Sequence, residues 1–343
     1  MKLKNVTVRE IAKEAGVSAA SVSRTLNGIG GVGEGTRNKI LEVCERLGYI
    51  PNTLARGLVL NDTKTIGIIV PDIQSPFYTR LMELAALEAK AHGYQVIMCV
   101  SFRDYETEVN YFNLLISHQV DGILYFPVGE KSGLYTKQFL RYVPIVSLNM
   151  MNEEGIPFVA TDEFSAGTLA TDYMISCGCK KLAYIGYTTG IAYEKRIKGF
   201  LSSIEGADIE GMVFDSGMTA HGGFNKGYVE FSAYWNKYRS LPDGIIASSD
   251  QAARGVIKAC MERNISIPEN MSLIAFDNIE SDLSLFKITS VSASHEQHVK
   301  KAFELLMKIK DKAALTNEEK RILIQPGVFP KDSCKNTSSL RYV

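Results

Sequence analysis

Two helix-start signals lie close together near the N-terminus, separated by one short turn. Thr7 and Glu10 form a capping box, in which the threonine hydroxyl can accept a hydrogen bond from the amide of residue 10 while the glutamate carboxylate reaches back. Apolar residues then recur at helical spacing as far as Gly16, which can adopt the left-handed conformation that ends a helix. Ser18 can cap a second helix that runs to about residue 26. The spacing therefore predicts two short helices joined by Gly16-Val17-Ser18.

This pair of helices has the features of a helix-turn-helix, whose second helix enters the major groove of DNA. Small side chains, Ala12 and Ala15, stand where the two helices would touch. A third apolar pattern, closed by Gly48, would cover both helices through Ile40, Leu41, Cys44 and Leu47. A generic three-helix bundle would show the same apolar pattern, but the outer face of the second helix is polar, with Ser21, Ser23, Arg24 and Asn27. That polar face favours DNA binding.

The charge distribution supports the same interpretation. Lys and Arg together number 38, and so do Asp and Glu, which gives a formal net charge of zero. Residues 1–60, however, hold nine basic and five acidic side chains, so the rest of the chain carries a compensating negative excess. This asymmetry indicates a small basic module joined to a larger acidic one.

Two other short patterns are interpreted as structural. Gly28-Ile29-Gly30-Gly31-Val32-Gly33 matches the G-x-G-x-x-G fingerprint of dinucleotide-binding proteins. It follows a predicted helix instead of a strand, so we predict a loop between helices. Cys177-Gly178-Cys179 ends a helical pattern and places glycine where helix C-termini favour it, so we expect a structural role rather than a metal or redox site.

Catalytic motifs are missing from the sequence. It contains no G-x-S-x-G, no P-loop and no zinc-type histidine motif, and we expect His295 and His298 at the surface. We therefore predict that the protein is not an enzyme, with no catalytic residues, no metal and no cofactor.

The composition indicates a globular protein of the cytoplasm. No apolar run approaches the roughly 20 residues that span a bilayer. The first fifteen residues lack the apolar region and the cleavage site of a secretory signal. Six cysteines are too sparse for a disulfide scaffold and suit a reducing compartment. We expect a cytoplasmic protein without a membrane partner.

From residue 65 onward, short apolar segments alternate with helical stretches, which predicts two parallel α/β layers. Strands are expected at residues 65–70, 95–100, 122–126, 145–148, 182–185, 244–247 and 273–275. Ligands of open α/β sheets bind beyond the carboxyl ends of the strands, where this chain places Asp72, Phe126, Asp162, Asp250 and Asp277. Carboxylates accept hydrogen bonds from hydroxyls and aromatic rings cover apolar sugar faces, so this set favours a hydroxyl-rich ligand. A helix N-cap is the alternative role for such an aspartate, Asp250 above all.

Residues 6–58 resemble the headpiece of the lac repressor (LacI/GalR) family of bacterial transcription regulators. The resemblance rests on Val8-Arg9-Glu10-Ile11-Ala12, Ala15-Gly16-Val17-Ser18, Ser21-Val22-Ser23-Arg24, Thr36-Arg37, Leu47-Gly48-Tyr49, Pro51-Asn52 and Ala55-Arg56-Gly57-Leu58. It implies that Ala19, Ala20 and Arg24 read bases, and that a hinge helix folds on DNA and inserts Leu58 into the minor groove. The expected DNA contacts are Thr7, Ser18, Ala19, Ala20, Ser21, Ser23, Arg24, Asn27, Asn52, Ala55, Arg56 and Leu58. The chain departs from the family pattern at Gly33 and Gly35, which predicts a frayed start of the third helix.

The remainder resembles the effector-binding core of the same family, which shares the two-lobed α/β fold of type I periplasmic sugar-binding proteins. Matching segments are Ile66-Gly67-Ile68-Ile69-Val70-Pro71-Asp72, Pro76-Phe77-Tyr78, Val120-Asp121-Gly122-Ile123, Arg196-Ile197-Lys198-Gly199-Phe200, Ser249-Asp250-Gln251-Ala252-Ala253 and Phe276-Asp277-Asn278. The resemblance implies effector contacts at Phe77, Tyr78, Asp162, Arg196, Ser249 and Asp277. At Met218 the family often has an aromatic residue that stacks on the ligand, so the site is expected to differ there.

The expected organisation is therefore an all-α headpiece followed by a two-lobed core. We predict the headpiece at 1–50, a hinge helix and linker at 51–62, the core at 63–331 and a flexible tail at 332–343. The first lobe is expected at about 63–162 and 294–322, and the second at about 163–291 and 323–331.

Together, these features predict a DNA-binding regulator, most simply a repressor of a sugar-utilisation operon that responds to a small carbohydrate. A homodimer on a near-palindromic operator is expected, since one headpiece reads too few base pairs and the tail lacks the leucine heptads of family tetramers. Alternatives are a purine effector, a protein corepressor or a solute-binding protein. The headpiece argues against the last. Glu304 stands where family members with a protein corepressor carry a basic residue, which argues against that alternative.

Overall fold

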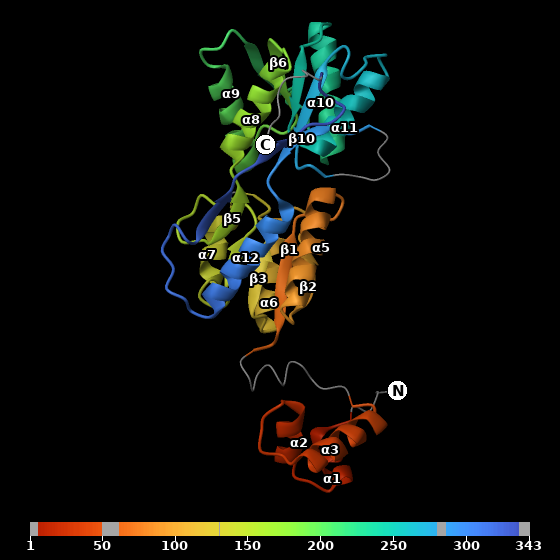
Figure 1. Ribbon diagram of the computed structural model, residues 1–343, viewed down its shortest axis with the longest axis vertical. Coiled ribbons are helices and arrows are strands. Elements are labelled where there is room, and N and C mark those ends of the chain that lie inside the picture. The colour runs from red at the N-terminus through yellow and green to blue at the C-terminus, as the bar shows by residue number, and fades with distance from the viewer. Residues whose placement is uncertain (1–5, 50–61, 130, 280–285, 336–343) are drawn as a thin grey trace. The chain divides into compact units, whose positions relative to one another are not determined.

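The computed structural model describes residues 6–49, 62–129, 131–279 and 286–335. The chain divides between Lys64 and Thr65 into two compact units (Figure 1). The described helices include none that is both long enough and apolar enough to cross a membrane.

The described part of the N-terminal unit contains three helices, α1 (Val8–Ala15), α2 (Ala19–Leu26) and α3 (Glu34–Arg46). The predicted capping box is confirmed, because the Glu10 amide donates to Thr7 Oγ1 at 3.3 Å and the Thr7 amide donates to Glu10 Oε2 at 2.8 Å. Gly16 ends α1 in the left-handed conformation, with φ of 65°. Ser18 caps α2 by accepting from the Ser21 amide at 3.0 Å. The predicted turn between the two helices is therefore also confirmed.

Apolar side chains from all three helices form the core of this unit: Ile11, Ala12, Ala15, Val22, Ile40, Val43 and Cys44. The predicted third helix is confirmed, but Leu41, expected in the core, is 45% exposed because it lies on the other side of α3. Residues 28–33 form the predicted inter-helix loop, and α3 begins directly after Gly33 without a side-chain cap. The dinucleotide-type glycine pattern is thus confirmed as a loop.

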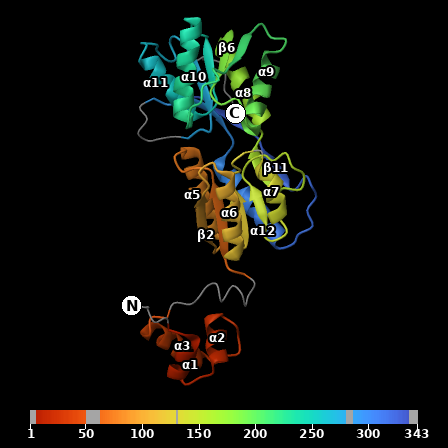
Figure 2. The same cartoon turned by 180° about the vertical axis from the view of Figure 1, so that it is seen from behind.

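The C-terminal unit contains two six-stranded sheets, which we call the first and second lobes. The first sheet has the order β11-β5-β4-β3-β1-β2, and its described neighbours are all parallel. Its strands are β1 (Thr65–Val70), β2 (Gln95–Val100), β3 (Gly122–Tyr125), β4 (Ile145–Ser147), β5 (Phe158–Thr161) and β11 (Arg321–Ile324). Helices α5 (Pro76–Ala91) and α12 (His295–Lys310) pack on one face, and α6 (Tyr105–Ser117) and α7 (Ser132–Phe139) on the other (Figures 1 and 2).

The second sheet has the order β12-β10-β9-β8-β6-β7, in which only the β10–β12 pair is antiparallel among the described strands. Its strands are β6 (Lys181–Ile185), β7 (Glu210–Phe214), β8 (Gly244–Ala247), β9 (Ser272–Phe276), β10 (Thr289–Ser292) and β12 (Gly327–Phe329). Helices α8 (Glu163–Ser176) and α9 (Ile191–Ile204) cover one face, and α10 (Gly223–Tyr238) and α11 (Asp250–Met261) the other. The predicted fold class is confirmed in both units.

The chain passes between the two sheets three times. It crosses after β5, returns after β10 to form α12 and β11, and crosses again before β12. The first lobe extends two residues beyond its approximate predicted end at residue 322, because β11 pairs with β5 as far as Ile324. The prediction of a flexible tail from residue 332 is wrong as far as residue 335. Ser333 and Cys334 are buried, and the Leu273 amide donates to the Ser333 carbonyl at 2.8 Å.

All seven predicted strands are present, with ends within one residue of those predicted. Five strands were not predicted: β5, β7, β10, β11 and β12. Three of these, β7, β11 and β12, are partly exposed, so their residues do not form the continuous apolar run by which buried parallel strands are recognised.

Candidate functional site

The exposed face of α2 is the candidate DNA-reading surface of the N-terminal unit. Val22 and Thr25 are buried against the other helices, whereas Ala19, Ala20 and Arg24 are exposed. Ala20 and Arg24 are four residues apart and therefore lie on the same side of the helix. A guanidinium beside small side chains can approach base edges closely and pair bidentately with guanine.

Several hydroxyls expected at DNA are also engaged inside the headpiece. Thr7 and Ser18 are helix caps, Ser18 Oγ lies 2.9 Å from Ser21 Oγ, and Asn27 Nδ2 donates to Ser23 Oγ at 3.3 Å. These bonds fix the N-terminus of α2, where backbone amides favour a phosphate. Asn52, Ala55, Arg56 and Leu58 lie outside the described residues.

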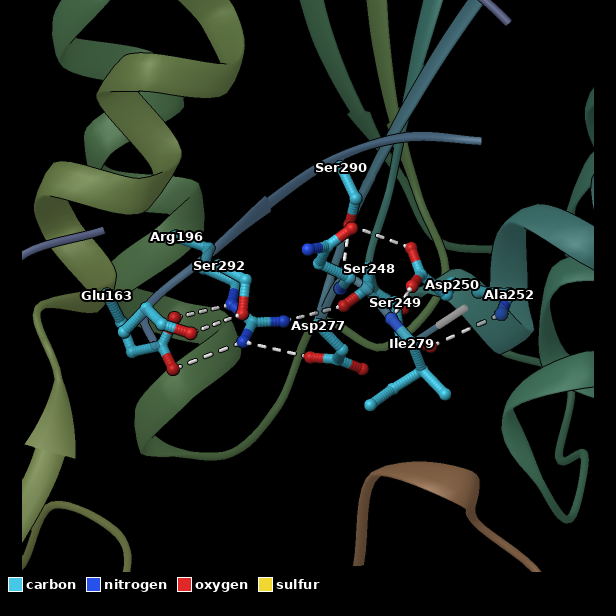
Figure 3. Close-up of polar contacts among 12 residues, drawn as sticks. Glu163, Arg196, Ser248, Ser249, Asp250, Ala252, Asp277, Ile279, Ser290 and Ser292 are labelled. Carbon is cyan, nitrogen blue, oxygen red and sulfur yellow. Dashed lines mark hydrogen bonds and ion pairs between the residues drawn. The ribbon is translucent and has the colours of Figure 1, made fainter. Parts of the chain in front are cut away.

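A buried ion-pair cluster lies at the carboxyl ends of the second sheet, centred on Arg196 of α9 (Figure 3). Arg196 binds Glu163 of α8 through two parallel bonds, Nε to Oε2 at 2.6 Å and Nη2 to Oε1 at 3.1 Å. Its Nη1 donates to the carbonyl of Ser248 at 2.8 Å, and its Nη2 lies 3.5 Å from Asp277 Oδ1. The structure thus brings Arg196 and Asp277 together, as predicted, and adds Glu163, which sequence reasoning missed.

Electrostatics within this cluster are set by burial and by an excess of carboxylates. Burial alone would lower the pKa of Arg196, but Glu163 and Asp277 raise it overall, so the guanidinium stays charged. Burial raises the pKa of Asp277, and Arg196 only partly opposes that effect. Asp277 also has a φ of 97°, a strained conformation that directs its carboxylate at the end of β9.

Asp250 is a buried anchor and not the helix cap that its position allowed. The N-cap of α11 is Ser249, whose hydroxyl accepts from the Ala252 amide at 3.2 Å. The Asp250 carboxylate instead accepts from the Ile279 amide at 2.7 Å and from Ser290 Oγ at 2.8 Å (Figure 3). Burial, with Asp277 as the next cause, raises the pKa of Asp250 to about 7. Asp250 therefore fixes the segment after β9 that carries Asp277.

In the first lobe, an aromatic cluster and one ion pair lie at the carboxyl ends of the strands. The rings of Phe77 and Tyr78 pack edge-on against each other and against Phe126, with centroids 5.1–5.9 Å apart. Asp72 accepts from the Gln74 and Ser75 amides and binds the Arg103 guanidinium. Sequence reasoning missed Arg103, which follows β2 at a positive φ in a loop with no distinctive pattern.

Charges of one lobe act on side chains of the other. Burial is the main cause that raises the pKa of Tyr78. Arg103 lowers this pKa, whereas Asp72 and Asp277 raise it, and Asp277 belongs to the second lobe. Conversely, burial raises the pKa of Tyr187 after β6, and Arg103 of the first lobe partly opposes this. Tyr187 stacks on Tyr193 of α9 with centroids 5.4 Å apart. The two sets of strand ends therefore face each other, and sequence reasoning missed both tyrosines.

Two other predicted contacts have structural partners. Asp162 caps α8 by accepting from the Ser165 amide at 3.1 Å and from Ser165 Oγ at 2.9 Å. Met218 is 55% exposed, and its carbonyl accepts from Lys226 Nζ at 3.1 Å. The loop that carries Met218 is thus fixed from α10.

The prediction of two surface histidines at the start of α12 is wrong. His298 is buried, its Nε2 lies 2.8 Å from the Val159 carbonyl, and burial lowers its pKa to about 4. His295 is half-buried beside Phe77, with ring centroids 5.8 Å apart. Both face the interior because α12 packs its first turns on the first sheet. The six cysteines are all free and buried, which fits the structural interpretation of Cys177-Gly178-Cys179.

The fold and these two sites define a class of protein, a helix-turn-helix DNA-binding unit joined to a two-lobed ligand-binding core. Residues 63–337 match the periplasmic binding proteins and sugar-binding domain of the LacI family, and residues 7–52 match the lacI family of bacterial regulatory proteins. The chain belongs to the LacI family and is a DNA-binding transcriptional regulator.

Individual relatives agree with this assignment. The HTH-type transcriptional regulator RegA of Clostridium saccharobutylicum is 29% identical over 95% of this chain and 98% of its own. Catabolite control protein A of Priestia megaterium is 31% identical over 80% of this chain and 83% of its own. A structure of the lac repressor dimer bound to operator and an anti-inducer has the same fold, with a TM-score of 0.82 and 18% identity over 96% of this chain and 99% of that one.

Proposed function

We propose that this regulator represses genes of sugar utilisation and is controlled by a small carbohydrate that binds between the strand ends of the two lobes. The observation that carries the proposal is the Arg196–Asp277 cluster of the second lobe, set opposite the aromatic cluster of Phe77, Tyr78 and Phe126. Carboxylates and a guanidinium bind hydroxyls, and aromatic rings cover the apolar face of a sugar ring. The match of residues 63–337 to a sugar-binding domain supports the same ligand class.

The proposed effector contacts are those predicted, with three additions: Asp72, Phe77, Tyr78, Phe126, Asp162, Arg196, Met218, Ser249, Asp250 and Asp277, together with Arg103, Tyr187 and Tyr193. Asp162, Ser249 and Asp250 act chiefly by positioning, because their side chains are already bound to backbone amides. No catalysis is proposed, since the relatives that match over most of the chain are transcription regulators. A regulator of transcription acts where the chromosome is, in the cytoplasm.

Control of DNA binding would follow from closure of the two lobes. A ligand held by both sets of strand ends favours one arrangement of the lobes over others. The lobes would move relative to each other about the three chain crossings that join them. The hinge segment 51–62 would transmit that arrangement to the headpieces of a homodimer on a near-palindromic operator. A coupling of a few kcal/mol suffices for a useful switch.

Exposed apolar side chains of the first lobe support the homodimer. β2 is the edge strand of its sheet, and Met98 on it is 47% exposed. Leu87, on the adjacent helix α5, is 55% exposed. An edge strand with apolar side chains is normally covered, and a second copy of the chain would cover it here.

A protein corepressor is the less favoured alternative. Glu304 is exposed on α12, where an acidic side chain would repel a phosphorylated partner. A purine would stack on the same aromatic cluster as a sugar.

The experiment that tests the proposal selects operator sites from random duplex DNA with the full-length chain and measures the affinity at several salt concentrations. We expect a near-palindromic site whose affinity falls steeply with salt, because phosphate contacts release counterions. A chain that begins at Thr65 should not bind the selected site. Retained binding by that truncated chain would contradict the headpiece assignment.

A further inference from the structure

The charged side chains near the facing strand ends are mainly acidic. Seven carboxylates lie there among the described residues: Asp72, Asp162, Glu163, Asp215, Glu230, Asp250 and Asp277. The described cations in the same region are Arg103, Arg196, Lys226 and Lys331.

Three of these cations are already bound to carboxylates, and Lys331 Nζ donates to Asn278 Oδ1 at 2.7 Å. Arg196 holds Glu163 and Asp277, as described above, and Arg103 holds Asp72. Lys226 Nζ lies 2.6 Å from Glu230 Oε1, which is fully buried, and 3.9 Å from Asp215 Oδ1. Within the described part of the chain, the four cations of this region are therefore all engaged by oxygen atoms of the protein, three of them by carboxylates.

Carboxylates also occupy some of the backbone amides near the helix N-termini that could bind a phosphate. Asp72 takes the Gln74 and Ser75 amides at the start of α5, and Asp162 takes the Ser165 amide in α8. A backbone amide that already donates to a carboxylate cannot bind a second anion. The first turns of α5, α7, α9 and α10 carry no side-chain cap, and the N-caps of α9 and α10 are Gly190 and Gly222.

We infer that the effector of this regulator is uncharged, a free sugar or polyol, and that the site discriminates against phosphate esters and sugar acids. This inference rests on the proposed function and concerns the charge of the ligand at the same site. Asp277 is held through Oδ1, and in Figure 3 its second carboxylate oxygen has no drawn partner. That oxygen can accept from a ligand hydroxyl, whereas a ligand oxyanion would be repelled by it.

The state of the neighbouring acids supports the argument. Burial raises the pKa of both Asp250 and Glu163, Arg196 partly opposes this at Glu163, and the charge of Asp277 raises the pKa of both acids further. Carboxylates that already repel one another in a buried cluster would be destabilised further by a phosphate placed beside them.

The test uses the full-length chain and matched pairs of ligands: D-ribose and ribose 5-phosphate, D-fructose and fructose 1-phosphate, D-glucose and glucose 6-phosphate. Binding is measured by the shift in Tm and by calorimetry, with inorganic phosphate compared with chloride at equal ionic strength. We expect the free member of a binding pair to bind at least tenfold more tightly than its ester, and phosphate to stabilise no more than chloride. The inference would be overturned if a phosphate ester bound more tightly than its free sugar. It would also be overturned if phosphate raised the Tm more than chloride did and the Lys226→Gln substitution removed that rise. If no sugar of the panel binds, the inference is tested by the comparison of the Tm in phosphate with the Tm in chloride.

A second variant tests the role assigned to the carboxylates. Asp277→Asn removes one negative charge and one hydroxyl acceptor, so the affinity for the free sugar should fall at least tenfold. The ratio of the affinity for the free sugar to that for its ester, or the difference between chloride and phosphate, should become smaller. Asp172→Asn on the exposed side of α8 is the matched control and should change neither. Wider discrimination in Asp277→Asn would contradict the inference.

Operator binding is measured on the same preparations. A chain that binds ligands with this preference but no operator DNA would refute the proposed function alone, and a chain that binds its operator but prefers the ester would refute the inference alone.

Discussion

Arg196 is a residue that the sequence analysis identified without identifying its main partner, Glu163. Resemblance to a family indicated Arg196 and Asp277, and the structure places them 3.5 Å apart. Glu163, which forms the shorter bonds to Arg196, lies 33 residues earlier on another helix. Only the packing of α8 on α9 brings the two together, and no local pattern encodes that packing. The role of these residues in effector binding stays a prediction.

His298 shows most clearly how the surroundings of a residue, here its burial, determine its protonation. Its folded-state pKa of about 4 lies below the ordinary 6.5, so its contribution to stability is present above pH 6.5 and is lost as the pH falls toward 4. The contribution is at most about 3 kcal/mol. His298→Gln keeps a donor for the Val159 carbonyl without titrating, so its unfolding free energy should depend less on pH between 4.5 and 6.5. Urea unfolding at several pH values measures this, and an unchanged pH dependence would contradict the assignment.

Asp250 should affect stability in the opposite direction. Its folded-state pKa of about 7 is above the unfolded value, so its stabilising contribution is present below about pH 4 and is lost as the pH rises through 7. Asp250→Asn can still accept from the Ile279 amide and can donate its own amide to Ser290 Oγ, so both contacts are kept without a charge. We expect its Tm to exceed that of the parent chain at pH 8, with the difference shrinking toward pH 5. Asp215→Asn, at a half-exposed position, is the control. A lower Tm for Asp250→Asn at pH 8 would show that its charge is needed.

At the scale of elements, helices with cap signals could be predicted almost to the residue, whereas short strands could not. α1 and α2 carry their boundaries in local chemistry, a capping box, a serine cap and a left-handed glycine. β11 and β12 are four and three residues long, and their existence depends on distant partners in β5 and β10. The sequence therefore predicts the end of the first lobe only approximately, and β11 continues to Ile324.

The close packing of α8 on α9 leads to a prediction about glycine. A Cβ at Gly199 of α9 would overlap the carbonyl oxygen of Phe164 in α8, so Gly199→Ala must separate the helices and disturb the Glu163–Arg196 pair. We expect a loss of about 2–4 kcal/mol in the free energy of unfolding. Gly35→Ala in α3 is the matched comparison, since a Cβ there meets no atom within 4 Å, and it should stabilise the headpiece by up to about 1 kcal/mol. Equal effects of the two changes on thermal unfolding would contradict this account.

At the scale of the whole molecule, the assembly can be tested without knowing the effector. Met98→Glu introduces a charge on the edge strand proposed to lie in the dimer interface, and we expect sedimentation to show a monomer that binds operator DNA at least tenfold more weakly. Leu134→Glu on α7, at a side chain that is also exposed, should remain dimeric. A dimer that survives Met98→Glu would place the interface elsewhere.

The three crossings between the sheets also constrain how such a protein can change over evolution. Each lobe is assembled from separate stretches of the chain, and residues 333–334 complete the second lobe beside β9. No single exchange of gene segments can therefore replace one lobe and leave the other whole. The junction at Lys64–Thr65 separates the two compact units. Recombination there would join an existing ligand-binding core to a different DNA-binding unit while preserving both folds.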